Sequence, residues 1–357
     1  MARNLCLKKA RQAADAVRYT GDHPNNKDDF RPFSLREVRD EFFQSSVEIH
    51  ANITPILERS LTKVCDRLGL DRDRVGAFVH NSSDLQATCY FTFEDQCLLR
   101  FSSSLVNLLE EDEFSFVAGH ELGHFLLEHS AIGVKERSLE YFVFQRAQEI
   151  SADRIGLLAC QDENAAARAL IKTVSGLESR HLQLDVGQFL SQLSRVERHS
   201  KSDHVFSTHP SMLVRTRSLM WFAMAKIHKS MTTERSKDLD KIDQRVARDL
   251  AKYVDGKALE GISNAKSEIE IWLAASIIIS DNRFNVEEQK KFLQLFGDDL
   301  LVKLKNFLSS APSGSVQDMV LARLSESKRR LEELAPVEYP QTYKKIRKKV
   351  LSHFQVI

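Results

Sequence analysis

The chain has 357 residues, of which 42% are hydrophobic and 28% are charged. This length exceeds that of an ordinary single-core domain and predicts two domains, with enough apolar residues for a sizeable core under a normal soluble surface. Lysine and arginine total 51 against 50 acidic residues. The chain therefore has no overall field that would attract nucleic acid or an anionic membrane, and we expect no nucleic-acid partner.

The cysteines and the apolar runs predict a cellular location. The cysteines number five, and no two have the spacing of a metal knuckle, which indicates reduced thiols in a reducing compartment. The N-terminal stretch carries charge throughout and lacks the apolar core of a signal peptide. The most apolar run, residues 271–279, is far shorter than the roughly 20 residues that span a bilayer. We expect a soluble, cytoplasmic protein without a transmembrane segment. A cleaved transit peptide of a eukaryote is the alternative for the N-terminal stretch, and the acidic residues that soon follow weaken it.

The first part of the chain mixes polar turns, helical periodicity and strand-like runs. Residues 1–33 are basic and then rich in turn formers, so we expect a flexible N-terminal arm. From Ser34 to Leu68 apolar residues recur at helical spacing, and Gly69 is a suitable helix stop. Residues 75–101 contain β-branched and aromatic runs broken by polar turns, which predicts short antiparallel strands.

The rest of the chain is predominantly helical in its apolar spacing. The predicted helices span about 113–129 (with Asp112 as N-cap), 138–160, 163–176, 182–197 and 211–229. The stretch 231–241 is charged without an apolar period and predicts a linker. Residues 242–357 then form a second, all-helical block.

The sequence His-Glu-Leu-Gly-His at positions 120–124 is the central chemical signal. On a helix, positions i and i+4 share a face, so the imidazoles of His120 and His124 can bind one zinc ion. Glu121 can act as general base on a water at the open metal position. The pattern also occurs by chance, but two histidines and a glutamate on an apolar helix each need a buried partner, which favours a metal site.

A third ligand is required, and two familiar spacings fail to supply one. The thermolysin-like spacing leads to position 144, which is Phe, and the metzincin spacing leads to position 130, which is Ser. The downstream carboxylates are Glu136, Glu140 and Glu149. Glu149 stands out because Asp153 follows it on the same helix face, where it can hydrogen-bond a ligand histidine. The alternative is a solvated helix face on which Glu149 pairs with a neighbouring arginine.

A polar loop further along offers groups for transition-state stabilisation. In Ser-Thr-His-Pro, His209 is held by a proline, and Arg215 follows six residues later. His209 can donate to the developing oxyanion of a scissile carbonyl, and Arg215 can orient it. Lone loop histidines are more often surface residues, and we interpret His129 and His204 in that way.

In combination, these motifs resemble the HtpX and CAAX-prenyl-protease type of zinc metallopeptidase. The resemblance covers residues 34–230 and rests on HELGH, on Glu-x-x-x-Asp in QEISADRIG, and on STHP with the later arginine. It implies a mainly α (α+β), zincin-like domain with a small antiparallel sheet, Zn²⁺ as cofactor, and a protein or peptide substrate.

The resemblance also implies roles for individual residues. It assigns zinc binding to His120, His124 and Glu149, base catalysis to Glu121, support of a ligand to Asp153, and transition-state contacts to His209 and Arg215. A strand before the metal helix, here about 86–93 followed by 97–101, would bind extended substrate by β-augmentation. Three departures are the missing membrane helices, the short interval between the second histidine and the glutamate, and Gln-Ala in place of Asn-Ala in that strand.

The C-terminal block resembles the all-helical tellurite-resistance TerB-like domain over residues 242–310. Its acidic turn near Asp281, Glu287 and Glu288 has too few ligands for a calcium loop, and a helix cap at Asn285 explains the acids better. The basic run at 343–349 is best interpreted as a solvated helix face, with binding to a membrane surface, nucleic acid or an acidic partner as the alternative.

These observations predict a soluble zinc endopeptidase, gated by its N-terminal arm, the 198–209 loop or the helical module. The C-terminal helical module is the expected binding site for a regulatory protein partner. One alternative is an interaction or regulatory protein on a peptidase-like scaffold with a structural zinc. A metal hydrolase acting on another bond is the third possibility, because water activation is common to all such enzymes.

Overall fold

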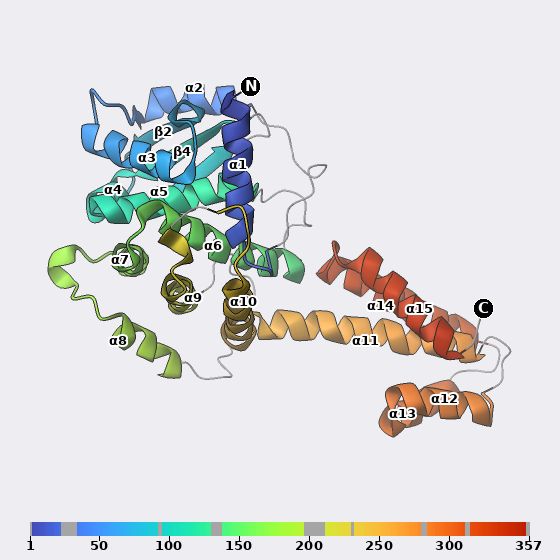
Figure 1. Ribbon diagram of the computed structural model, residues 1–357. Helices are drawn as coiled ribbons and strands as arrows, with labels where there is room; N and C mark the ends of the chain where they lie inside the picture. Colours follow the sequence, from blue (N-terminus) through green and yellow to red (C-terminus); the bar gives the residue numbers. More distant parts are fainter. Residues whose placement is uncertain are drawn as a thin grey trace. The chain divides into compact units, whose positions relative to one another are not determined.

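Four strands form one mixed sheet in the order β1–β2–β4–β3 in the computed structural model of the protein (Figure 1). The structure describes residues 2–22, 34–91, 95–129, 138–195, 211–229, 232–279, 284–310 and 315–354. The strands are β1 Val47–Glu48, β2 Val75–His80, β3 Ala87–Phe91 and β4 Cys97–Ser102.

The prediction of purely antiparallel strands is wrong for the pair β2 and β4. These two strands run parallel, with Val75 opposite Cys97, whereas β3 pairs antiparallel with β4 and β1 with β2. The reason lies in β4, where Leu98 and Leu99 are both fully buried although they point to opposite faces. A strand covered on both faces takes a central position, which leaves β3 at the edge of the sheet.

The chain divides into two compact units. The first comprises residues 1–133 and 143–255, and the second comprises 134–142 and 256–357. The helices mostly in the first unit are α1 Ala2–Val17, α2 Leu35–Ser45, α3 Pro55–Leu68, α4 Ser103–Leu108, α5 Glu111–Leu126, α6 Leu139–Cys160, α7 Glu163–Ser175, α8 Val186–Ser191, α9 Met212–Met224 and α10 Lys237–Leu250. The mainly helical α+β class predicted from the sequence is confirmed.

The N-terminal segment is structural, and the prediction of a flexible arm is wrong for residues 2–22. Helix α1 places Leu7, Ala14 and Val17 in the main core, and Tyr19 is only 4% exposed. The spacing of these apolar residues gives the helix one apolar face beneath its basic residues. The arm prediction for residues 23–33 lies outside the described residues.

Helices α5 and α6 approach each other closely through small residues. A Cβ atom added to Gly119 would lie 2.3 Å from the Cβ atom of Ala159 and 3.2 Å from the Cα atom of Gly156. A Cβ atom added to Gly123 would lie 3.1 Å from the Cα atom of Ala152. The glycines of the HELGH helix therefore bring the α6 backbone near enough for side chains of both helices to meet.

The second unit is helical, and its boundary differs from the predicted one. Its helices are α11 Gly256–Ile278, α12 Val286–Phe296, α13 Asp298–Ser310, α14 Val316–Leu334 and α15 Tyr339–Phe354. The predicted linker 231–241 and boundary at 242 are wrong, because α10 begins at Lys237 and buries Leu239 and Val246 in the core of the first unit. The predicted cap is confirmed, since the Asn285 side chain accepts from the backbone N–H of Glu288. Among the described residues, no helix is both long and apolar enough to cross a membrane.

Candidate metal centre

Helix α5 is buried along most of its length and begins at an acidic cap. The N-cap of this helix is Glu110 and not the predicted Asp112. The backbone N–H of Glu110 donates to the Glu113 carboxylate at 2.9 Å. Glu113 is fully buried and also accepts from Lys172 Nζ at 2.6 Å and from Arg168 Nε at 2.8 Å. This paired acid in the first turn anchors the helix start, where negative charge is stabilising.

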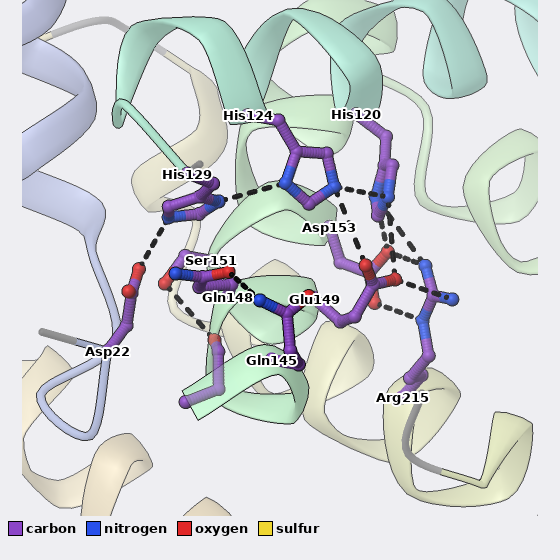
Figure 2. Close-up of polar contacts among 11 residues, drawn as sticks. Asp22, His120, His124, His129, Gln145, Gln148, Glu149, Ser151, Asp153 and Arg215 are labelled. Atoms are coloured by element: carbon purple, nitrogen blue, oxygen red, sulfur yellow. Dashed lines mark hydrogen bonds and ion pairs between the residues drawn. The ribbon is translucent and has the colours of Figure 1, made fainter. Parts of the chain in front are cut away.

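Three side chains from α5 and α6 converge on one point (Figure 2). The Nε2 atoms of His120 and His124 are 3.2 Å apart, and each lies 3.5 Å from a carboxylate oxygen of Glu149. Ligand atoms about 2.0–2.2 Å from a shared tetrahedral zinc lie roughly 3.3–3.6 Å apart. The three side chains thus have the chemistry and spacing of three corners of a zinc tetrahedron, and they form the candidate metal site among the described residues.

The hydrogen bond behind His120 shows that its Nε2 atom is available as a ligand. Nδ1 of His120 lies 3.0 Å from Oδ1 of Asp153, and that carboxylate also accepts from Arg215. An ionised carboxylate only accepts, so Nδ1 carries a proton, and in the neutral imidazole that binds metal Nε2 presents a lone pair. The Nε2 atoms of the two histidines are 3.2 Å apart, a separation at which both could bind one zinc ion. The residues therefore fit the metal.

Asp153 stays ionised in this site although it is buried. Burial would raise the pKa of Asp153, but the positive charge and hydrogen bonds of Arg215 outweigh it and hold the pKa well below its usual range. Arg215 comes from α9 and also places Nη1 at 3.1 Å from Oε2 of Glu149. Arg215 thus touches both carboxylates of the Glu-x-x-x-Asp pair predicted from the sequence.

Glu121 faces a cavity next to the three metal-site residues. The cavity has a volume of about 310 Å³. Its lining includes Ala87, His120, Glu121, Glu149 and Arg215. Burial raises the pKa of Glu121 to about 7, with the neighbouring His120 opposing that shift and Glu149 adding to it. A carboxylate of such pKa exchanges protons near neutral pH.

The other carboxylates considered for the third ligand have different places. Glu140 lies at the start of α6 and accepts from the backbone N–H groups of Val337 and Glu338 at 2.8 and 3.0 Å. It therefore caps a turn of the second unit. Glu136, like His204 and His209, lies outside the described residues, so the oxyanion role predicted for His209 stays a prediction.

Two residues near the site were missed by sequence reasoning. His129 was interpreted as a surface residue, yet its side chain is only 1% exposed, and its Nδ1 atom lies 3.0 Å from Nδ1 of His124. Its Nε2 atom lies 2.9 Å from Oδ2 of Asp22, whose side chain is fully buried. The position of His129 just beyond the metal helix was a usable signal, whereas nothing in the sequence links Asp22 to a helix that begins 89 residues further along the chain.

The HExxH helix, the glutamate on the following helix and the cavity beside them define a metallopeptidase-type domain. The family model of Peptidase family M48 matches residues 53–144 and 136–221, so this part of the chain is similar to M48 peptidases. The predicted HtpX and CAAX-prenyl-protease resemblance is thereby confirmed at the level of the family. Peptidases of this family use zinc, and the His-His-Glu set is its candidate site here.

One curated relative gives a more particular comparison. The chloroplastic plastoglobule-localized metallopeptidase 48 of Arabidopsis thaliana is 26% identical over 188 residues, which cover 47% of this chain and 49% of the relative. The chain thus matches about half the length of that relative. No solved structure matches the chain significantly. The TerB-like resemblance is not supported by these matches, because the family match ends at residue 221.

Proposed function

We propose that this protein is a zinc-dependent endopeptidase with Glu121 as its general base. The observation that supports this most strongly is the position of Glu121 in the same cavity as His120 and Glu149. A structural zinc site is closed by protein ligands, whereas a catalytic site keeps one position open next to a base. Three protein ligands beside a cavity are the arrangement expected of a catalytic site.

The proposed reaction divides the work among a few side chains. A bound zinc would lower the pKa of a water ligand towards about 7 and polarise the scissile carbonyl. Glu121 accepts the proton of the attacking water and passes it to the leaving amine. Asp153 keeps the proton of His120 on Nδ1, and Arg215 holds Asp153 and Glu149 in place. His209 is proposed, from its sequence context, as a donor to the developing oxyanion.

Strand β3 is the proposed binding edge for an extended peptide substrate. It is the last strand of the sheet, and on its other side it pairs with β4. Gln86 and Ala87, at its start, line the cavity together with Glu121. A peptide added to this edge by backbone hydrogen bonds would pass beside the metal site. The backbone of Cys89 on this strand lies near the proposed base and lowers the pKa of Glu121, against the effect of burial.

Gating, partners and localisation remain proposals from the sequence. Helix α1 packs into the core, so residues 2–22 do not act as a free gate. We retain the 198–209 segment and the C-terminal helical module as the proposed gating elements, the latter with a regulatory protein partner. A cytoplasmic location rests on the odd number of cysteines and their spacing.

The test is the substitution Glu121→Gln, which keeps the shape of the side chain and removes its basicity. We expect cleavage of unfolded casein to fall by roughly 10²–10⁴-fold, the usual contribution of a general base, with zinc content unchanged. Glu111→Gln, in the exposed first turn of the same helix, serves as the matched control and should keep full activity. Absence of zinc from the wild-type protein, or full cleavage by Glu121→Gln, would contradict the proposal.

A further inference from the structure

The two candidate histidine ligands are supported from behind in different ways. His120 contacts a carboxylate directly, through Asp153. His124 instead contacts a second imidazole, that of His129, which in turn contacts the carboxylate of Asp22 (Figure 2). We propose that His129 and Asp22 are positioning residues for His124, so that a segment near the N-terminus is an integral part of the metal centre. This inference rests on the proposed zinc site.

The direction of each hydrogen bond follows from the carboxylate at the end of the chain. Ionised Asp22 can only accept, so Nε2 of His129 carries a proton. Nδ1 of a neutral His129 is then an acceptor, and Nδ1 of His124 must donate to it. The Nε2 atom of His124 is left with its lone pair directed at the metal position. This chain of hydrogen bonds from Asp22 through His129 to His124, called the relay below, therefore selects the metal-binding tautomer of His124. The contact with Asp153 does the same for His120.

Asp22 is held firmly at the buried end of this relay. Its backbone N–H donates to the carbonyl of Tyr19 at 2.9 Å, and its carboxylate lies 3.4 Å from Nη1 of Arg18. Arg18 also donates to the carbonyl oxygen of Leu127, at the end of α5, at 3.1 Å. The turn that carries Asp22 is thus joined directly to the end of the metal helix.

The same turn is also fixed to α6 and α10. The backbone N–H of Tyr19 donates to the hydroxyl of Ser151 at 3.1 Å, and that of Thr20 donates to Asp243 at 3.0 Å. Arg154 donates to the carbonyl of Val17 at 3.0 Å. Ser151 lies between Glu149 and Asp153 along α6, so the turn is anchored to the helix that supplies the remaining metal-site carboxylates.

A purely structural ion pair is the competing explanation for the buried Asp22–His129 contact. If His129 were a cation, both of its nitrogens would donate, and Nδ1 of His124 would have to accept. The proton of His124 would then sit on Nε2 and block metal binding. The two explanations therefore predict opposite changes in zinc affinity. Loss of the relay weakens zinc binding if His129 positions His124, and strengthens it if the contact is a purely structural ion pair.

The experiment measures zinc affinity on apo protein by competition with a chromophoric chelator, independently of peptidase activity. We expect Asp22→Ala to weaken zinc binding by roughly 10–100-fold, the usual effect of removing a group that orients a metal ligand. Asp15→Ala is the matched control, since Asp15 also pairs with Arg18, at 2.8 Å, but is exposed and makes no described contact with His129. Its affinity should equal that of the wild type.

Two amide substitutions at His129 separate positioning from packing. In His129→Asn the amide takes the place of Nδ1 and can still accept from His124, whereas in His129→Gln the amide takes the place of Nε2 and cannot. We expect His129→Asn to restore most of the zinc affinity and the Co²⁺ absorption spectrum of the wild type, and His129→Gln to lose both. Thermal unfolding of each apo variant shows whether its fold is retained.

Each result has one meaning for the inference. Weaker zinc binding in Asp22→Ala and His129→Gln, with recovery in His129→Asn, supports it. Equal or tighter binding in Asp22→Ala and His129→Gln overturns it while leaving the zinc peptidase proposal intact. Absence of zinc binding by the wild-type protein would contradict the proposed function, and with it this inference. Equal losses in His129→Asn and His129→Gln would show packing alone and also overturn it.

Discussion

Asp153 and Arg215 meet through two parallel hydrogen bonds, from Nε to Oδ2 at 2.9 Å and from Nη2 to Oδ1 at 2.6 Å. Both side chains are almost fully buried. Paired bonds of this kind fix the plane of the carboxylate as well as its charge. Because Oδ1 also faces Nδ1 of His120, the orientation of a candidate zinc ligand on α5 depends on an arginine on α9.

Removal of Arg215 should therefore affect both stability and metal binding. We expect Arg215→Leu to lower the free energy of unfolding of the apo protein by about 3–5 kcal/mol, because Asp153 is left as an unpaired buried charge. Urea unfolding measures this change. The control is Arg323→Leu on α14, whose ion pair with Glu326 is solvent-exposed, and it should cost less than about 1 kcal/mol. Equal losses in the two variants would contradict a special role for the buried pair.

The close contact of α5 and α6 predicts that alanine is not tolerated at Gly119. Its Cβ atom would lie 2.3 Å from that of Ala159, so the helices must separate and move Glu149 away from the histidines. We expect Gly119→Ala to cost about 1–3 kcal/mol in unfolding free energy and to weaken zinc binding, as measured by urea unfolding and chelator competition. In Gly261→Ala, on α11, the new Cβ meets only the flexible end of Leu139 at 3.2 Å. That variant should keep zinc affinity and gain up to about 1 kcal/mol from helix propensity.

Much of the metal site could be predicted from the sequence because its signals are local. His120 and His124 share a helix face by spacing alone, and Glu149 with Asp153 repeats the same i, i+4 relation on the next helix. The contact of Asp22 with His129 could not be predicted, since it joins residues 107 apart. Both side chains are buried, and their burial cannot be inferred from the local sequence pattern.

The errors in the fold have a similar origin. Helices α1 and α10 carry many charges on their exposed faces, and this charge suggested an arm and a linker, although each helix buries a narrow apolar face. The parallel pairing of β2 and β4 depends on which strand is covered on both faces. That property is decided by the surrounding helices and not by the strand itself.

The cysteines should differ sharply in their reactivity. Cys6 is exposed, whereas Cys65 and Cys160 are buried, and burial raises the pKa of each of these two thiols to about 12. Thiolate is the reactive form, so the buried thiols should stay unmodified at pH 8. Mass spectrometry after brief treatment with a thiol reagent should find label on Cys6 and none on Cys65 or Cys160 in the native protein. Denaturation in urea should make all five cysteines reactive, and rapid native labelling of Cys65 would contradict the packing of α3.

The identity of the third ligand can be tested through two glutamates of the same helix. Glu149 lies 3.5 Å from the Nε2 atoms of both histidines, whereas Glu140 binds two backbone N–H groups of the second unit. Zinc that binds only the folded state stabilises it by RT ln(1 + [Zn]/Kd), which is about 2.7 kcal/mol at a free concentration of 100 Kd. We therefore expect zinc to raise the melting temperature of the apo wild-type protein.

We expect Glu149→Gln to abolish most of this zinc-induced rise, because a neutral amide is a much poorer ligand than a carboxylate. Glu140→Gln should lower the melting temperature of the apo protein slightly, through weaker capping, but keep the full rise on adding zinc. Differential scanning calorimetry with and without zinc distinguishes the two effects within each variant. A full rise in Glu149→Gln would assign the third ligand to another residue, and loss of the rise in Glu140→Gln would point to that residue on the first turn of α6.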